Sequence, residues 1–308
     1  MQTISEEDRR RHTPVEGDAT WQESFFLGWT DIRNRCAGHH HISLCPALNR
    51  AHVWTWLIVD GKEVARSQEN EIPLPSGDLT DINIGILRFI AGEAIRELHL
   101  TAEFDDAKVD VDYKSYIDPV HIDINSGKLK LGSRHYESMG AVRGSVTHAG
   151  RTIEINGTGW QDHSWGSRRL SSNPAGRWVF AVFGEDLAFS LYSLASSIGT
   201  IIFGYVIDNG AVEPIEAAKC GFVIADDGIS PESCDTTLWT RSGKGYRLRG
   251  RVVATALVGG PGWSGDGNHF WMDGLTEFEH ADRVGGGLLE VSTLKAPTEE
   301  QRTVLKLV

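Results

Sequence analysis

The stretch "IRELHLTAEFDDAKVDVDY", residues 95–113, decides the fold class of this chain. Every second residue from Leu98 to Phe104 is apolar, and polar side chains stand between them. Alternation with a period of two residues is the pattern of a strand that buries one face. After the turn residues "DDAK" the alternation resumes from Val109 to Tyr113. The stretch therefore predicts an antiparallel β-hairpin.

The same alternation runs through most of the remaining sequence. Residues 140–157 predict a second hairpin, with its turn at Ala149 and Gly150. Further strands, separated by turns rich in glycine, asparagine and aspartate, are predicted at residues 177–184, 187–194, 200–207, 212–224, 234–242, 246–258, 270–280 and 285–294.

Helix signals are weak. Residues 6–12, "EEDRRRH", lack an apolar face, and we expect residues 1–14 to form a loose polar arm. Residues 79–95 have an ambiguous apolar pattern, which fits either a short helix or another pair of strands. We therefore expect a low helix content.

The predicted fold class is all-β. Antiparallel strands joined by tight turns either stack as a sandwich or close on themselves, and closure removes the unpaired edges. At 308 residues the chain is long enough for two domains that each bury a core. We expect two consecutive antiparallel β-barrel domains with little helix, at residues 15–155 and 156–300.

The amino-acid composition limits the kinds of partner that we expect this protein to bind. The chain carries 42 acidic and 30 basic side chains, a formal net charge of −12, so no nucleic acid partner is expected. No apolar run has the length of a membrane span, and the first residues lack the apolar core of a signal peptide, so we expect a cytoplasmic protein. The cysteines have no metal or redox spacing and are expected to be reduced: Cys36, Cys45, Cys220 and Cys234.

The segment "GTGWQDHSWGSRR", residues 157–169, holds the strongest candidates for chemistry. On a strand, Trp160 and Asp162 share one face, and His163 and Trp165 share the other. A carboxyl group beside indole rings is poorly solvated, so its pKa rises and it can act as a general acid. The alternative is a structural Asp162 that accepts backbone hydrogen bonds at a domain corner, with the tryptophans as packing.

Three consecutive histidines, residues 39–41, raise the question of a metal site. His39 and His41 point the same way on a strand, but no acidic third ligand lies at a diagnostic spacing, so no metal is expected. These two histidines are expected to line the first barrel or its rim. Trp54 and Trp56, which share one face of a strand, either pack in the core or line a pocket.

Other aromatic residues extend the set of candidates. Trp178 is expected to be a further substrate contact. The glycine-rich residues 259–274 lack the spacing of a phosphate-binding loop and are expected to form a long connection, a flap that carries Trp263, Asp266 and His269. Because the chain also lacks a nucleophile elbow, covalent catalysis is disfavoured.

Three motifs together resemble a known family. They are "HYESMGAVRGSV" at residues 135–146, "GTGWQDHSWGSR" at 157–168 and "MDGLTEFEHADRVGGGLLEVS" at 272–292. The sequence is similar to the two-domain, lipocalin-related group that includes carotenoid 1,2-hydratases and AttH-like proteins, most specifically at Asp162–Gly166. This resemblance implies two lipocalin-like, calycin-type β-barrels. For the hydratase branch it also implies addition of water to an isoprenoid double bond without a metal or an organic cofactor.

The resemblance also implies roles for single residues. Asp162 would protonate the alkene, and Trp160 or Trp165 would stabilise the carbocation through the π face of its ring. His163 would orient the attacking water or the carboxyl group.

The leading hypothesis is a cofactor-independent hydro-lyase that acts on an apolar, terpenoid-like or polycyclic unsaturated substrate. An isomerase or cyclase, including a pericyclase, could use the same acid without positioning a water. A noncatalytic protein that binds hydrophobic ligands is the alternative from another class. The expected partner is a small apolar substrate, and the oligomeric state stays open, with a homodimer as one option.

Overall fold

A computed structural model describes residues 4–124, 133–168, 175–196, 199–259 and 269–294, apart from the side chains of Ser196, His269 and Leu294. The described residues form antiparallel strands and two short 3₁₀ helices, η1 (Glu6–Arg9) and η2 (Pro46–Leu48), which confirms the all-β class. No helix among them is long and apolar enough to cross a membrane. The chain divides into two compact units, Met1–Arg169 and Leu170–Val308.

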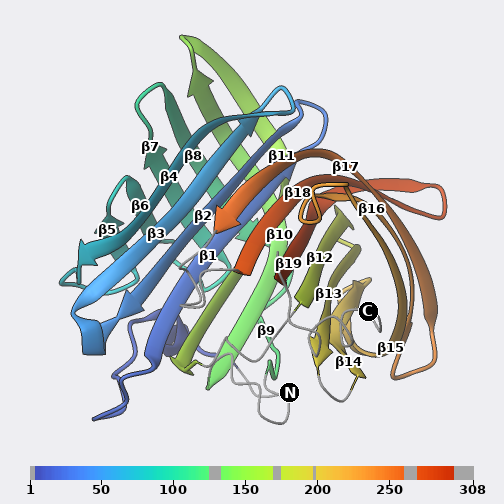
Figure 1. Ribbon diagram of the computed structural model, residues 1–308, viewed down its shortest axis with the longest axis horizontal. Coiled ribbons are helices and arrows are strands. Elements are labelled where there is room, and N and C mark those ends of the chain that lie inside the picture. Colours follow the sequence, from blue (N-terminus) through green and yellow to red (C-terminus); the bar gives the residue numbers. More distant parts are fainter. Residues whose placement is uncertain (1–3, 125–132, 169–174, 197–198, 260–268, 295–308) are drawn as a thin grey trace. The chain divides into compact units, whose positions relative to one another are not determined.

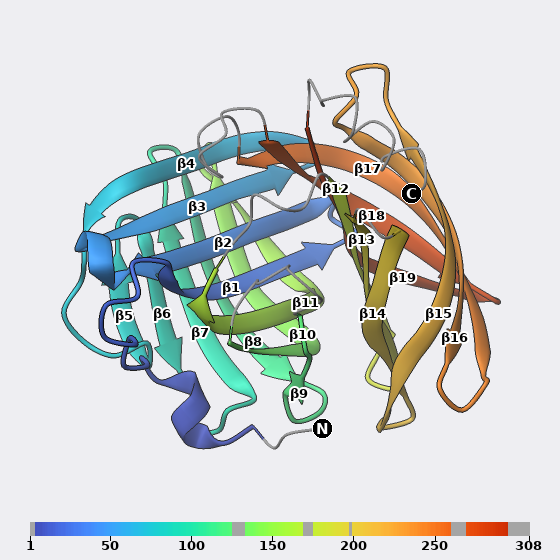
Figure 2. The ribbon, with the colours of Figure 1, turned by 60° about the horizontal axis from the view of Figure 1, so that its bottom comes forward.

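Unit 1 is built on one curled antiparallel sheet (Figures 1 and 2). Its strands are β1 (Trp21–Asp31), β2 (Cys36–Cys45), β3 (Arg50–Val59), β4 (Lys62–Pro73), β5 (Asp81–Ile84), β6 (Leu87–Ala91), β7 (Glu97–Glu103), β8 (Ala107–Ser115), β9 (Val120–His121), β10 (Arg134–His148) and β11 (Arg151–Ser167). They are hydrogen-bonded in the order β4-β3-β2-β1-β11-β10-β8-β7-β6-β5, and β9 pairs with β10.

The alternation in the sequence accounts for these strands. Strands β7 and β8 form the hairpin predicted from residues 95–113, with Leu100 opposite Val111 and both side chains buried. The ambiguous residues 79–95 contain β5 and β6, so the strand pair is correct there and the helix is not. Cross-strand packing of the apolar side chains stabilises this arrangement.

Unit 2 is a closed barrel in which the strands follow one another in chain order. They are β12 (Ala175–Gly184), β13 (Leu187–Ser196), β14 (Gly199–Asp208), β15 (Ala211–Ile224), β16 (Pro231–Thr240), β17 (Gly245–Gly259), β18 (His269–His280) and β19 (Arg283–Leu294). Each strand predicted beyond residue 175 overlaps one of these. Inward apolar side chains such as Phe189, Leu238, Leu248 and Phe278 form its core.

The first residues of the chain are docked on unit 1, and the prediction of a loose arm is wrong for the part that the structure describes. Helix η1 presents Glu6 to the backbone N–H of Ile95, and the Arg9 guanidinium donates to the carbonyl of Gly92. Asp8 is buried and forms an ion pair with Arg134. Polar contacts hold this segment, which explains why an apolar periodicity does not reveal it.

The boundary expected between residues 155 and 156 falls inside β11. The structure divides the chain after Arg169 instead, because β11 pairs along its length with β1 and β10. The motif at residues 157–168 therefore belongs to unit 1. All four cysteines are free thiols.

Candidate functional site

Strand β11 holds the motif between two long neighbours. Asp162 lies directly opposite Phe26 of β1 and opposite Glu137 of β10. Because side chains alternate along a strand, Asp162 and His163 project from opposite faces of the sheet, in agreement with the alternation in the sequence. The two residues therefore lie in different environments.

The hydrophobic core of unit 1 lies on the side of His163. Phe25 and Leu27 of β1 belong to this core, and they are the cross-strand partners of His163 and Gln161. Asp162 projects from the other face of the same sheet. That face is also buried, but its side chains are mostly aromatic or polar rather than aliphatic.

We define the aromatic face as the side of β3, β2, β1 and β11 that carries Asp162. Two rows of cross-strand partners form it, namely Trp56, His39, Gly28 and Trp160 in the first row, and Trp54, His41, Phe26 and Asp162 in the second. The structure thus brings six of the predicted site residues together. These six residues come in pairs from β3, β2 and β11, and strand pairing brings the three pairs together.

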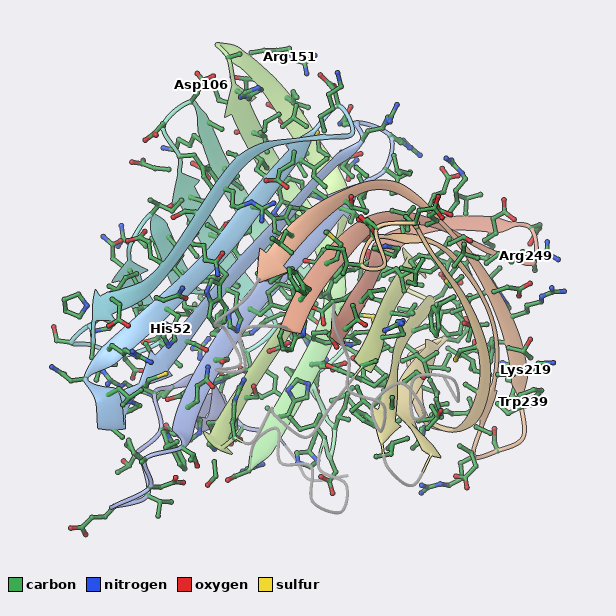
Figure 3. The ribbon with its side chains drawn as sticks, viewed as in Figure 1. His52, Asp106, Arg151, Lys219, Trp239 and Arg249 are labelled. Carbon is green, nitrogen blue, oxygen red and sulfur yellow. The ribbon has the colours of Figure 1, made fainter. Side chains whose placement is uncertain are left out.

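The rings of the aromatic face are in direct contact. His41 stacks on Trp54 with ring centroids 4.8 Å apart and planes inclined by 8°. The ring of His52, which is labelled in Figure 3, also stacks on Trp54, with ring centroids 5.4 Å apart. The His39 ring lies 4.4 Å from that of Phe26. These contacts make a continuous wall of rings.

Gly28 makes room for Trp160 in this wall. A Cβ atom at residue 28 would lie only 2.6 Å from Cζ2 of the Trp160 indole. The ring therefore lies against the backbone of β1, which only glycine permits at this distance. Trp160 is fully buried beside its neighbour Asp162.

The histidines of the wall are neutral. Burial lowers the pKa of His39 to about 3. Burial, together with repulsion from His39, holds the pKa of His41 well below its usual value. Both imidazoles therefore act as polar aromatic rings rather than cations at neutral pH. Such a wall is suited to apolar ligands.

Asp162 is a buried acid, with 7% of its surface exposed. Burial raises the pKa of its carboxyl group to about 7; the charge of His135 opposes this, Glu137 raises the pKa further and Arg168 lowers it. Within the described part of the chain, the carboxyl group takes part in no hydrogen bond or ion pair. The backbone hydrogen bonds required by a structural role are thus absent among these residues. A carboxyl group in this state can donate a proton near neutral pH.

Two further residues of this face were not singled out from the sequence. His135 and Glu137 of β10 are buried, and His135 Nε2 lies 2.9 Å from Glu137 Oε1. The stretch "HYESMG" contained the signal, because residues 135 and 137 share one face of a strand. Only the register with β11 reveals that they lie beside Asp162.

His163 belongs to a separate cluster on the core side. Its Nε2 lies 3.0 Å from Glu23 Oε1, and Nδ1 of His12 lies 2.7 Å from the same oxygen. The His12 ring stacks on Trp165 at 3.7 Å. Burial by itself would raise the pKa of Glu23, but the hydrogen bonds from His12 and His163 outweigh it and the pKa is lowered. The cluster fastens the N-terminal segment to the sheet.

By residue type, this cluster could hold a metal ion. One ligand atom each from His12, Glu23 and His163 lies within 4.8 Å of the others. However, both imidazoles are at hydrogen-bonding distance from one carboxylate oxygen, as the distances above record. Hydrogen bonding therefore accounts for their convergence without an ion.

The middle histidine of the triplet and the remaining candidates lie elsewhere. His40 projects to the core side, where it accepts a hydrogen bond from Trp29 Nε1 at 3.1 Å and contacts Thr55 Oγ1 at 2.8 Å. Trp178 belongs to β12 of unit 2, where its ring stacks on Tyr192 at 4.6 Å. The proposed flap residues Trp263 and Asp266 and the side chain of His269 lie outside the described residues.

Solved structures of other proteins share this fold, and they include the following three. A protein from Nitrosomonas europaea described as an AttH has a TM-score of 0.62 at 12% identity, and the match covers 91% of this chain and 95% of that one. CghA, solved with Sch210972, has a TM-score of 0.61 at 8% identity, with 93% and 95% covered. Kievitone hydratase from Nectria haematococca has a TM-score of 0.57 at 12% identity, with 91% and 90% covered.

These similarities confirm the two-domain fold that the resemblance implied. A model for "Domain of unknown function (DUF7064)" matches residues 5–295. No curated protein matches the sequence.

Proposed function

The chain belongs to the DUF7064 family, and we propose that it is an acid catalyst that hydrates an apolar unsaturated substrate, with Asp162 as the proton donor. One observation carries the proposal. The Asp162 carboxyl group is buried beside a wall of aromatic rings, its pKa is raised to about 7, and no described residue donates a hydrogen bond to it. A general acid works best when its pKa lies near the working pH.

The chemistry follows from the surroundings of this carboxyl group. Asp162 protonates a carbon–carbon double bond at its less substituted carbon and leaves a tertiary carbocation. The faces of Trp160 and Phe26 stabilise the cation, and a desolvated cation–π contact contributes about 2 kcal/mol. The neutral rings of His39 and His41 add polarisable surface without repelling the positive charge. Water then adds to the cation.

The substrate class follows from the same wall. Neutral aromatic side chains offer contact to hydrocarbon but few hydrogen bonds, which suits a terpenoid-like or polycyclic molecule. A hydratase is among the solved proteins of this fold, which supports addition of water as the reaction. Proton transfer and water addition require no organic cofactor, so none is part of this proposal.

The test uses three terpenoid alkenes, farnesol, geranylgeraniol and squalene, in water labelled with ¹⁸O. Hydration is expected to give a product heavier by one labelled water. Products of unchanged mass would indicate an isomerase or cyclase, and binding without turnover would indicate a ligand carrier. Asp162→Asn should abolish the product. The exposed Asp106, labelled in Figure 3, provides the matched control Asp106→Asn, which should keep it.

A further inference from the structure

A second buried carboxyl group lies next to Asp162. Glu137 is the direct cross-strand partner of Asp162, and both side chains project from the same face. Opposite residues of an antiparallel pair have Cβ atoms roughly 5 Å apart. The Glu137 side chain has no exposed surface. Two buried carboxyl groups therefore project side by side from this face of the sheet.

His135 positions Glu137. The two residues share one face of β10, and His135 Nε2 lies 2.9 Å from Glu137 Oε1. His135 also lines a cavity of about 230 Å³, together with His121, Asp123 and Arg134. A cavity of this size with polar walls has room for several water molecules. Glu137 thus stands between His135, which lines the cavity, and its cross-strand partner Asp162.

Hydration needs a base as well as an acid, because a water that adds to a carbocation becomes positively charged and must lose a proton. We propose that Glu137 is this base and that His135 is the residue that positions it. This inference rests on the proposed role of Asp162 as the acid. It adds a second catalytic carboxyl group to that role.

The protons balance over one cycle. Asp162 gives its proton to the alkene carbon, a new C–H bond forms, and Asp162 becomes a carboxylate. Water forms the C–O bond and passes one proton to the Glu137 carboxylate. The protonated Glu137 then transfers this proton to Asp162, which restores both groups. The net reaction consumes one alkene and one water and yields one alcohol.

The test separates the acid step from the water step, with geranylgeraniol in deuterium oxide as the probe. Asp162 can add deuterium to the alkene and remove a proton from the same carbon, so recovered alkene that contains deuterium reports the acid step. Alcohol reports water addition. Glu137→Gln is expected to lower alcohol formation on the order of 10² to 10⁴-fold while deuterium exchange continues. Alcohol and deuterium in the parental ratio would overturn the proposal.

A control and a second variant keep the result unambiguous. Glu23→Gln removes a buried carboxylate on the core side and should leave the ratio of alcohol to deuterium unchanged. If Glu137→Gln does not fold, Glu137→Asp retracts the carboxyl group by one methylene and should lower the same ratio. A parent protein that yields neither alcohol nor deuterium would refute the proposed function, and this inference with it.

The role of His135 has its own readout. His135 Nε2 holds Glu137 Oε1 at 2.9 Å, so His135→Gln should let the Glu137 carboxyl group move and lower the ratio of alcohol to deuterium while deuterium exchange continues. A merely structural histidine would lower alcohol formation and deuterium exchange together. An unchanged ratio would overturn the positioning role.

Discussion

Asp162→Asn should remove the activity while leaving the protein as stable as the parent, or more stable. The magnitude follows from the pKa of the carboxyl group, which burial raises from 3.8 to about 7. Each pKa unit corresponds to about 1.4 kcal/mol, so the difference amounts to about 4 kcal/mol as an upper value. The neutral amide has nearly the same shape and does not ionise. The difference in the free energy of unfolding between the parent and Asp162→Asn therefore depends on pH.

The direction follows from linkage. A pKa that is raised in the folded state means that the folded protein binds the proton more tightly than the unfolded chain. The stabilising contribution of the protonated Asp162 is complete below pH 3.8 and is lost as the pH rises through about 7. Above this range the parent carries the free-energy cost of a buried, unsupported carboxyl group, and the asparagine variant does not.

Urea denaturation at a series of pH values measures this difference, with Asp106→Asn as the control. The free energies of unfolding of parent and Asp162→Asn should agree at about pH 4 and diverge by a few kcal/mol, in favour of the variant, at about pH 8. Turnover should fall on the order of 10² to 10⁴-fold. A variant that is less stable by about 1 to 3 kcal/mol at every pH would show that Asp162 is a structural hydrogen-bond acceptor.

Other perturbations have defined outcomes. In the parent, the hydration rate should fall with the loss of one proton as the pH rises through about 7, and a flat profile would exclude Asp162 as the acid. Gly28→Ala should displace the Trp160 ring, lower turnover and reduce stability by about 1 to 3 kcal/mol, whereas Gly221→Ala, which has space for a Cβ, should do neither. Glu23→Gln should lower the urea midpoint by an amount that shrinks as the pH falls below 4.5, because the folded pKa of Glu23 is lowered; an unchanged midpoint would show that the cluster of His12, Glu23 and His163 does not fasten the N-terminal segment. Metal analysis should find no stoichiometric zinc, and activity that a chelator removes and zinc restores would revive the metal site.

Local patterns in the sequence were sufficient for the strands. The apolar alternation around Leu100 and Val111 identifies a hairpin because each residue contributes to one buried face. The same rule separates Asp162 from His163. Both predictions depend only on neighbours along the chain, and the structure has the expected arrangement.

Such rules do not predict which distant strands pair, or in which register they pair. Glu137 lies beside Asp162 because β10 and β11 pair in one particular register. A shift of one residue would place Glu137 opposite His163 or Gln161. His12 reaches Glu23 through side-chain hydrogen bonds that have no periodic signature, which is why the N-terminal segment was expected to be loose.

The central claim, that Asp162 is a protonated acid near neutral pH, can be measured directly by ¹³C NMR of the protein labelled at its aspartate carboxyl carbons. The resonance that is missing from the spectrum of Asp162→Asn belongs to this residue, and its shift is followed against pH. The structure predicts a titration midpoint of about 7. A midpoint at or below 3.8, the ordinary value for aspartate, would contradict the account.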